Sequence, residues 1–315
     1  MILSGAAALS AASPRHSVIM KISKIKHIML SVINEVSFTC RKFNHWYGNG
    51  RMYAKHIIAL AIGNIFRVSD RELPEELKSR GLLKILGYKN MPNHSIFSKV
   101  RKALGEEIIG QTAGFVIQQL YKNRSILLIA IDSTFVPYWF KKDKNARLGH
   151  ATLSRKENEM LNSRIKKEFG KKHLKRGYKL HAIYDVETGI PLYWIVLSAN
   201  IHDKIAFKTL FDYVNIHFRI AHNAKFLADS AYDSRDIRFV LRESGFVDVI
   251  AINGRGHYKS SIPNDPDYRK RTAIERFNSI MKMKLNLLYV RFNGIKSVTA
   301  HVSSCIFGYL IKYIL

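Results

Sequence analysis

The sequence predicts an α/β domain with a mixed sheet flanked by helices, preceded by an all-helical N-terminal region. In the first 121 residues the apolar positions recur every three or four residues, which is typical of amphipathic helices. From Ser125 onward, short apolar runs alternate with helical segments, which is typical of a sheet with crossover helices. The 315 residues, 47% of them hydrophobic, suffice for one large domain or two smaller ones. We therefore expect an unfolded leader at 1–15, a helical region at 16–121 and an α/β domain at 122–315.

The helical region should contain a series of short helices. They are predicted over 19–36, 51–66, 69–81, 96–104 and 106–121. Ser69 followed by Glu72 forms a capping-box pattern, which marks the start of the helix over 69–81. Gly105 is expected to end the helix over 96–104. The helix over 96–104 should expose Lys99, Arg101 and Lys102, which would bind DNA if this helix enters a groove. An ordinary solvated helix face is the alternative.

The α/β domain should open with three strands joined antiparallel. The apolar run Ile126–Ile131 predicts a buried strand that ends at Asp132. Strands over 178–184 and 190–198 should form a hairpin, because the residues between them favour a turn. A basic insertion at about 138–177 separates the first strand from this hairpin.

The second half of the domain should alternate helices and strands. The expected order is a helix over 204–217, a strand over 226–228 ending at Asp229, a helix closed by Gly245, a strand over 246–252 and a helix over 268–288. Such crossovers place parallel strands beside the antiparallel ones and give a mixed sheet. The apolar stretch 297–315 contains His301 and Lys312, so it predicts a core helix and not a membrane span.

The charge of the chain points to a polyanionic partner. Lys and Arg number 51 against 24 Asp and Glu, a formal net charge of +27 at pH 7. Nucleic acid is the first candidate and an anionic membrane surface the second. The segment 141–177 alone carries 13 basic against four acidic residues, and either contacts phosphates or is a solvated run of charge. Only Cys40 and Cys305 are present, which excludes a disulfide framework or a cysteine-rich zinc module and favours a reducing compartment.

Three carboxylates are candidates for catalysis. Asp132 and Asp229 should end neighbouring strands, where open sheets bind their ligands. Glu275 lies on the late helix, and with α-helical geometry it shares one stripe with Tyr268, Arg271 and Lys282. Converging carboxylates repel unless cations neutralise them, and hard oxygen ligands suit a pair of Mg²⁺ or Mn²⁺ ions that act on a phosphodiester. A surface ladder in which Arg271 pairs with Glu275 is the alternative for the helix alone.

Taken together, these motifs resemble the DDE transposases of bacterial and archaeal insertion sequences. The late helix reads Tyr268-x2-Arg271-x3-Glu275-x6-Lys282, the Y-x2-R-x3-E-x6-K pattern of one large group of them. Ile131-Asp132-Ser133-Thr134 and Ala228-Asp229-Ser230-Ala231-Tyr232-Asp233 resemble its two Asp motifs. Gly177-Tyr178-Lys179-Leu180-His181, Gly189-Ile190-Pro191 and Asn200-Ile201-His202-Asp203 resemble its middle region.

The resemblance implies a ribonuclease H-like core and a metal-binding triad of Asp132, Asp229 and Glu275. It implies that Arg271 and Lys282 contact transposon-end DNA and that Tyr268 contacts a phosphate. The expected protein cleaves and joins double-stranded DNA at transposon ends and target sites with two Mg²⁺ ions, for which Mn²⁺ can substitute. It would act as a homodimer on DNA, in the cytoplasm at the nucleoid, without a membrane partner.

Two other functions fit the same residues. One is a ribonuclease H-like nuclease that cuts without strand transfer, and the other is a non-enzymatic or domesticated DNA-binding relative. Two further residues have more than one possible role. Asp203 is expected to cap the helix over 204–217, with a place near the metals as the alternative. His181, on a strand, is expected to be structural, with a catalytic role as the alternative.

Overall fold

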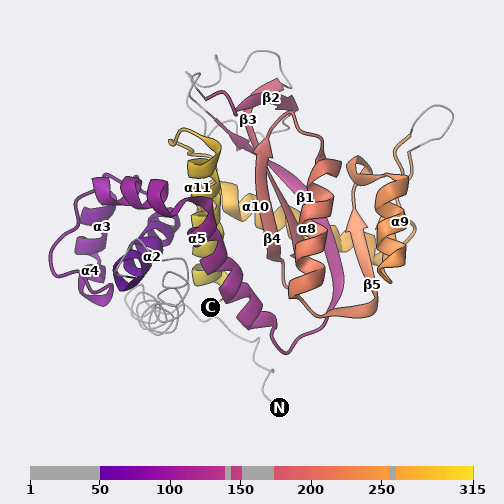
Figure 1. Ribbon diagram of the computed structural model, residues 1–315, viewed down its shortest axis with the longest axis horizontal. Helices are drawn as coiled ribbons and strands as arrows, with labels where there is room; N and C mark the ends of the chain where they lie inside the picture. The colour runs from indigo at the N-terminus through magenta and orange to yellow at the C-terminus, as the bar shows by residue number, and fades with distance from the viewer. Residues whose placement is uncertain (1–49, 139–142, 151–173, 255–259, 315) are drawn as a thin grey trace, which may run out of the picture.

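The computed structural model describes residues 50–138, 143–150, 174–254 and 260–314 (Figure 1). The expected leader at 1–15, the helix over 19–36 and most of the basic insertion lie outside these residues. Inside them, the α/β architecture with a helical N-terminal portion is confirmed.

The sheet is mixed, with six strands among the described residues. The strands are β1 (Ile126–Pro137), β2 (Arg147–His150), β3 (Leu174–Asp185), β4 (Ile190–Ser198), β5 (Ile220–Ala228) and β6 (Val247–Ile250). Their order is β2-β3-β1-β5-β6, and β4 also pairs with β3. β3 runs antiparallel to β1 and β4, whereas β5 runs parallel to β1 and β6. An antiparallel three-strand start followed by parallel crossover strands is the topology of a ribonuclease H-like core.

Helices cover both faces of this sheet. The N-terminal helices are α2 (Gly50–Phe66), α3 (Leu73–Ser79), α4 (Leu82–Ile85) and α5 (Ser95–Tyr121). The later helices are α8 (Asp203–His217), α9 (Arg235–Glu243), α10 (Thr272–Lys284) and α11 (Ile295–Tyr309). Three short turns of other helix types complete the described helices, η1 (Ser230–Tyr232), η2 (Pro266–Arg271) and the terminal η3 (Leu310–Ile314). α8 lies across one face of the sheet and α10 across the other (Figure 1).

The C-terminal helix α11 joins the helical region to the sheet. It is almost entirely buried and packs against α5, α2 and β4. One continuous apolar core therefore runs from Ala54 in α2 to Ile311. The expected core helix is confirmed, and no helix in the described ranges is long and apolar enough to cross a bilayer. The packing shows no break at residue 121, so the division of the chain there stays a prediction from sequence.

α2 and α9 appear close to their predicted positions, whereas the helix predicted over 69–81 is the shorter α3. The capping box forms, since the Glu72 carboxylate accepts hydrogen bonds from the Ser69 backbone N–H at 2.8 Å and hydroxyl at 2.7 Å. Gly81 and Gly245 follow their helices with positive φ angles of 68° and 78°, a conformation that glycine adopts without steric cost.

Gly105 does not end a helix, which corrects the prediction made for it. α5 runs without interruption from Ser95 to Tyr121. A glycine inside a helix costs about 1 kcal/mol relative to alanine. The extensive packing of α5 on α11 outweighs that cost.

The late helix also differs from its prediction. The α-helical part begins only at Thr272, and Tyr268 and Arg271 lie in the tighter turn η2. Pro266 starts that turn and the Asp265 side chain accepts a hydrogen bond from the Asp267 backbone N–H, both of which favour a short turn over a full helix start. The stripe expected from regular α-helical spacing therefore holds only from Thr272 onward.

Three buried histidines predict a loss of stability in acid. Burial is the first cause that lowers the pKa values of His56, His181 and His301, each from 6.5 to about 4. Between pH 6.5 and 4 the unfolded chain binds protons that the folded chain does not, so stability is lost as pH falls through this window. We expect Tm to fall from pH 7 to pH 5, because these three histidines outnumber Asp132, whose pKa is raised to about 7 and whose contribution has the opposite sign. His301→Leu should flatten this dependence in thermal unfolding, and an unchanged slope would contradict the assignment.

Candidate active site

Asp132 lies where two strands of the sheet separate. The parallel pairing of β1 with β5 ends at Ala130, opposite Leu227, while its antiparallel pairing with β3 continues to Pro137. The strand thus does not end at Asp132 as predicted, because β3 supplies a partner for five further positions. Asp229 follows the last residue of β5, as expected, and its carboxylate accepts a hydrogen bond from the Ala231 backbone N–H at 2.9 Å. Both carboxylates therefore lie at the fork between β1 and β5.

Electrostatics confirm that these acids are neighbours. The pKa of Asp132 is raised to about 7: burial is the main cause and the negative charges of Asp229 and Asp203 add to it, whereas Arg271 and a hydrogen bond from the Ser133 backbone N–H oppose the rise. The hydroxyl of buried Tyr232 has no hydrogen-bond partner among the described residues, and burial, Asp203, Asp132 and Asp229 raise its pKa well above the usual value. The fork is thus a small, buried acidic centre.

Arg271 is the cation beside this centre. Its guanidinium lies 3.8 Å from the Asp132 carboxylate and donates a hydrogen bond of 3.1 Å to the Tyr268 hydroxyl. The same guanidinium lies 5.4 Å from the centre of the Tyr268 ring. Arg271 therefore pairs with Asp132 and not with Glu275, which rules out the surface ladder as the arrangement in this structure.

The third expected ligand, Glu275, stays apart from the other two. Its side chain is exposed, and no group of three His, Cys, Asp or Glu residues in the described chain is placed to hold a metal ion. Asn278, one turn later on α10, instead reaches the site and donates a hydrogen bond of 3.2 Å to Asp132. Glu275 lies three residues before Asn278, about 4.5 Å along the helix axis, with its own side chain in solvent. Sequence reasoning missed Asn278, because nothing in its local pattern separates it from any other helix residue.

Asp203 belongs to the site and does not cap its helix, which corrects the first of its two expected roles. His202 is the capping residue of α8, and its ring accepts a hydrogen bond from the Lys204 backbone N–H at 3.3 Å. The Asp203 carboxylate pairs with Lys179 at 2.8 Å and lies 3.8 Å from His181. His181 is fully buried, and burial holds its pKa at about 4, so it is neutral at physiological pH. The alternative position near the acidic centre is therefore the observed one.

The residues expected to bind DNA divide into two groups. Lys99 and Lys102 are exposed on α5, as predicted. Arg101 is only 3% exposed, forms two hydrogen bonds with Asp70 and stacks on the Phe292 ring at 3.9 Å, so the expectation that it lies at the surface is wrong. Lys282 is 7% exposed and thus also buried. The roles of Lys99, Lys102, Tyr268, Arg271 and Lys282 in DNA binding stay predictions.

The residues at the fork fit a hard divalent cation. Carboxylate oxygens are the ligands that Mg²⁺ and Mn²⁺ prefer, and Asp132 and Asp229 supply them side by side. Burial, the main cause of the raised Asp132 pKa, disfavours the charged carboxylate, and a bound cation would favour it. Exposed Glu275 forms no ion pair in the described chain.

The strand order and the paired carboxylates define a ribonuclease H-like domain with an acidic centre. The family model of the transposase DDE domain matches residues 123–311. The chain belongs to this transposase family. No curated protein matches the chain.

Solved structures of transposases are also similar to the chain, at low identity. A piggyBac transposase synaptic complex with hairpin DNA has 11% identity and a TM-score of 0.46, with 92% of this chain and 74% of that one covered. A Mos1 strand transfer complex has 14% identity and a TM-score of 0.26, with 79% and 80% covered. A mariner Mos1 paired-end complex with Mg has 12% identity and a TM-score of 0.23, with 78% of each chain covered.

Proposed function

We propose that this protein is the transposase of an insertion sequence, which binds the terminal inverted repeats of its element and catalyses metal-dependent strand cleavage and strand transfer. Membership of the transposase DDE domain family supports the reaction class. The observation that carries the proposal is the pair of carboxylates at the β1–β5 fork, where the charge of Asp229 helps to raise the pKa of Asp132 to about 7.

In the proposed site Asp132, Asp229 and Glu275 hold two Mg²⁺ ions, for which Mn²⁺ can substitute. Such ions activate an attacking oxygen and stabilise the leaving oxygen of a phosphodiester. Asp132 has to lose its proton before it can act as a ligand, and Arg271 favours that loss. Asn278 fixes the orientation of the Asp132 carboxylate through its amide. Exposed basic residues, among them Lys99 and Lys102 of α5, would hold the DNA backbone.

The proposed partners follow from the reaction. Joining two transposon ends to a target requires that both ends be held at once, so we expect a homodimer on double-stranded DNA. The formal charge of +27 suits a long phosphate backbone. The expected place of action is the nucleoid in the cytoplasm.

The test uses the DNA on both sides of the gene. With Mg²⁺, the full-length protein should nick or cut labelled duplexes at the element boundary and join the released 3′ ends to a target plasmid. EDTA should stop both steps and Mn²⁺ should restore them, since the proposed reaction requires a divalent ion at the carboxylates. Cleavage without joining would favour the nuclease alternative. Binding without cleavage in either metal would favour the non-enzymatic relative.

A further inference from the structure

A large pocket lies away from the acidic centre, between the helical region and the catalytic domain. Its volume is about 790 Å³. One wall is the segment 64–72, which leads from α2 to α3, and the other is the segment 286–292, which follows α10. The two walls come from parts of the chain more than 200 residues apart, so the pocket exists only when both regions are packed together. Its volume lies within the range of sites that hold a small molecule or part of a larger one.

The pocket is lined by a surplus of positive charge. Four arginines face two acids, and Arg101 already neutralises Asp70 through two hydrogen bonds. The Glu72 carboxylate is occupied by hydrogen bonds from Ser69. The remaining arginines are exposed and form no salt bridge in the described chain; they are Arg67, Arg71 and Arg291. Guanidinium groups in this state are suited to bind phosphate oxygens.

Aromatic and imidazole groups complete the pocket. Tyr289 is half-buried, and the Arg67 guanidinium lies 5.9 Å from the centre of its ring. His301 is 2% exposed, and its Nε2 donates to the Asn286 carbonyl at 3.2 Å. Its other nitrogen, Nδ1, has no partner in the described chain. Because the pKa of His301 is lowered to about 4, this nitrogen is an unprotonated acceptor for an N–H or O–H group.

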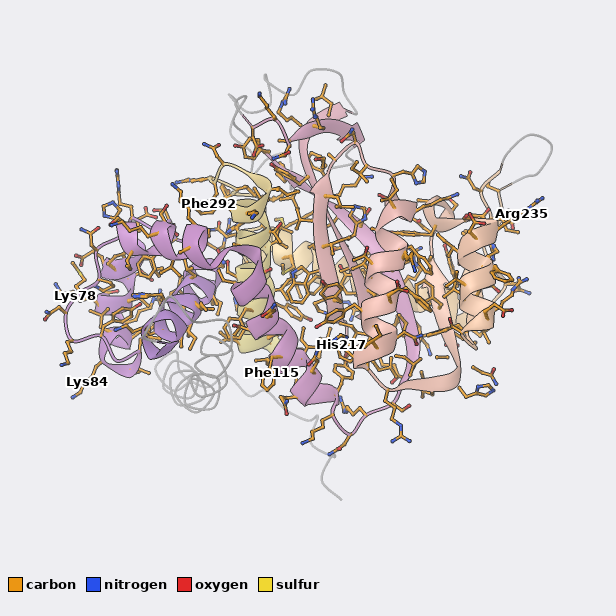
Figure 2. The ribbon with its side chains drawn as sticks, in the orientation of Figure 1. Lys78, Lys84, Phe115, His217, Arg235 and Phe292 are labelled. Atoms are coloured by element: carbon orange, nitrogen blue, oxygen red, sulfur yellow. The ribbon has the colours of Figure 1, made fainter. Side chains whose placement is uncertain are left out.

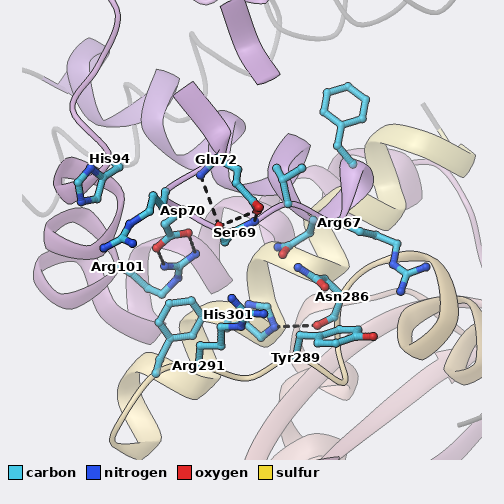
Figure 3. A pocket seen from close by; sticks show the side chains of 15 residues that line it. Arg67, Ser69, Asp70, Glu72, His94, Arg101, Asn286, Tyr289, Arg291 and His301 are labelled. Atoms are coloured by element: carbon cyan, nitrogen blue, oxygen red, sulfur yellow. Dashed lines mark hydrogen bonds and ion pairs between the residues drawn. The ribbon is translucent and has the colours of Figure 1, made fainter. Parts of the chain in front are cut away.

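The shape of the pocket favours a strand over a small anion. Figure 3 shows Arg67 and His94 at opposite ends, with His301 and the Arg101–Asp70 pair between them. A single phosphate ion would meet only part of this length. A nucleic-acid strand presents a phosphate at every nucleotide, with sugars and bases between the phosphates that can contact Tyr289.

We propose that this pocket binds the sugar-phosphate backbone of one DNA strand, with Arg67, Arg71 and Arg291 on its phosphates and Tyr289 against the adjoining nucleotide. The inference rests on the proposed function in that the strand is transposon-end DNA. The pocket is formed by both regions of the chain. A DNA strand bound there would therefore hold the helical region and the catalytic domain in a fixed position on the same DNA.

The test measures the affinity of the full-length protein for a labelled duplex from the DNA flanking the gene, in EDTA and over a series of salt concentrations. The plot of log affinity against log salt has a negative slope. Arg67→Gln, Arg71→Gln and Arg291→Gln should each make this slope less steep by about one. Each should weaken binding by about tenfold at moderate salt. Tyr289→Leu should weaken binding without a change in slope, because it removes no charge.

Arg235→Gln is the matched control. Arg235 is an exposed arginine on α9 that forms no salt bridge in the described chain, and in Figure 2 it lies on the other side of the sheet from Phe292 of the pocket. It should keep the wild-type affinity. Unchanged thermal stability of all four arginine variants would show that the fold is intact.

Several results would overturn the proposal. One is wild-type affinity and slope in the three pocket variants. Another is a rise in Tm with inorganic phosphate that the pocket variants lose while their DNA affinity is unchanged, since the pocket would then hold a small anion. The outcome is separable from the proposed function. If the pocket variants bind and cleave DNA like the wild type, only the proposal for the pocket is contradicted. If binding depends on the pocket but the wild type does not cleave, only the proposed transposase activity is contradicted.

Discussion

Asp132→Asn and Asp229→Asn are each expected to lower Mg²⁺-dependent strand cleavage by about 1,000-fold or more. The amide keeps the shape of the carboxylate and removes the charge that a divalent ion needs. Loss of several kcal/mol of transition-state stabilisation corresponds to a loss of that size. DNA binding in EDTA should stay within about twofold, because the fork contributes negative charge and not phosphate contacts. Cleavage is followed on labelled duplexes that span the element boundary.

The same experiment tests Glu275, which the described structure leaves exposed and apart from the pair. If Glu275 completes the site when metal and DNA are bound, Glu275→Gln should lose cleavage to the same extent. Asp236→Asn is the control, since Asp236 is an exposed acid in the first turn of α9. Retained metal-dependent cleavage in any of the three site variants would overturn the assignment of Asp132, Asp229 and Glu275 as the triad.

Local pattern was sufficient to predict most of the fold. The β3–β4 hairpin, α8 and α11 appear close to their predicted positions, because turn residues and apolar periodicity are local properties. The end of β1 could not be predicted in this way. Whether a strand continues past Asp132 depends on its partner β3, which lies more than 40 residues later in the chain. The unbroken α5 likewise depends on packing against α11, near the other end of the chain.

The same distinction applies to the site. Asp229 could be placed from sequence because it follows an apolar strand, and its position after β5 is as predicted. The burial of Arg101 could not be predicted from sequence, because a basic residue on a helix is normally solvated. Only the fold brings Asp70 and Phe292 against it. Asp203 was ambiguous for a similar reason, since a residue at a helix start serves equally as a cap or as a partner for a distant lysine. Long-range pairing decides each of these roles.

Asn278→Ala is expected to lower the cleavage rate by about 10- to 100-fold, the cost usual for removal of a group that orients a metal ligand. The Asn278 amide donates to Asp132 at 3.2 Å, and its own oxygen accepts from the Tyr184 hydroxyl at 3.4 Å. Both Tyr184 and Asn278 are buried, so this chain of hydrogen bonds holds the Asp132 carboxylate against the core. Without it, the carboxylate can rotate away from the position shared with Asp229.

Two readouts separate this positioning role from a purely structural one. Asn278→Ala should raise the Mg²⁺ concentration needed for half-maximal cleavage, whereas a packing defect would lower Tm without that change. Asn278→Asp keeps the size of the side chain but places another negative charge beside Asp132, which raises the Asp132 pKa further. Its cleavage should therefore require a higher pH than the wild type. Ser279→Ala, at the exposed neighbouring position of α10, should match the wild type in both measurements. If Asn278→Ala and Asn278→Asp also keep the wild-type metal requirement and pH dependence, Asn278 does not position Asp132.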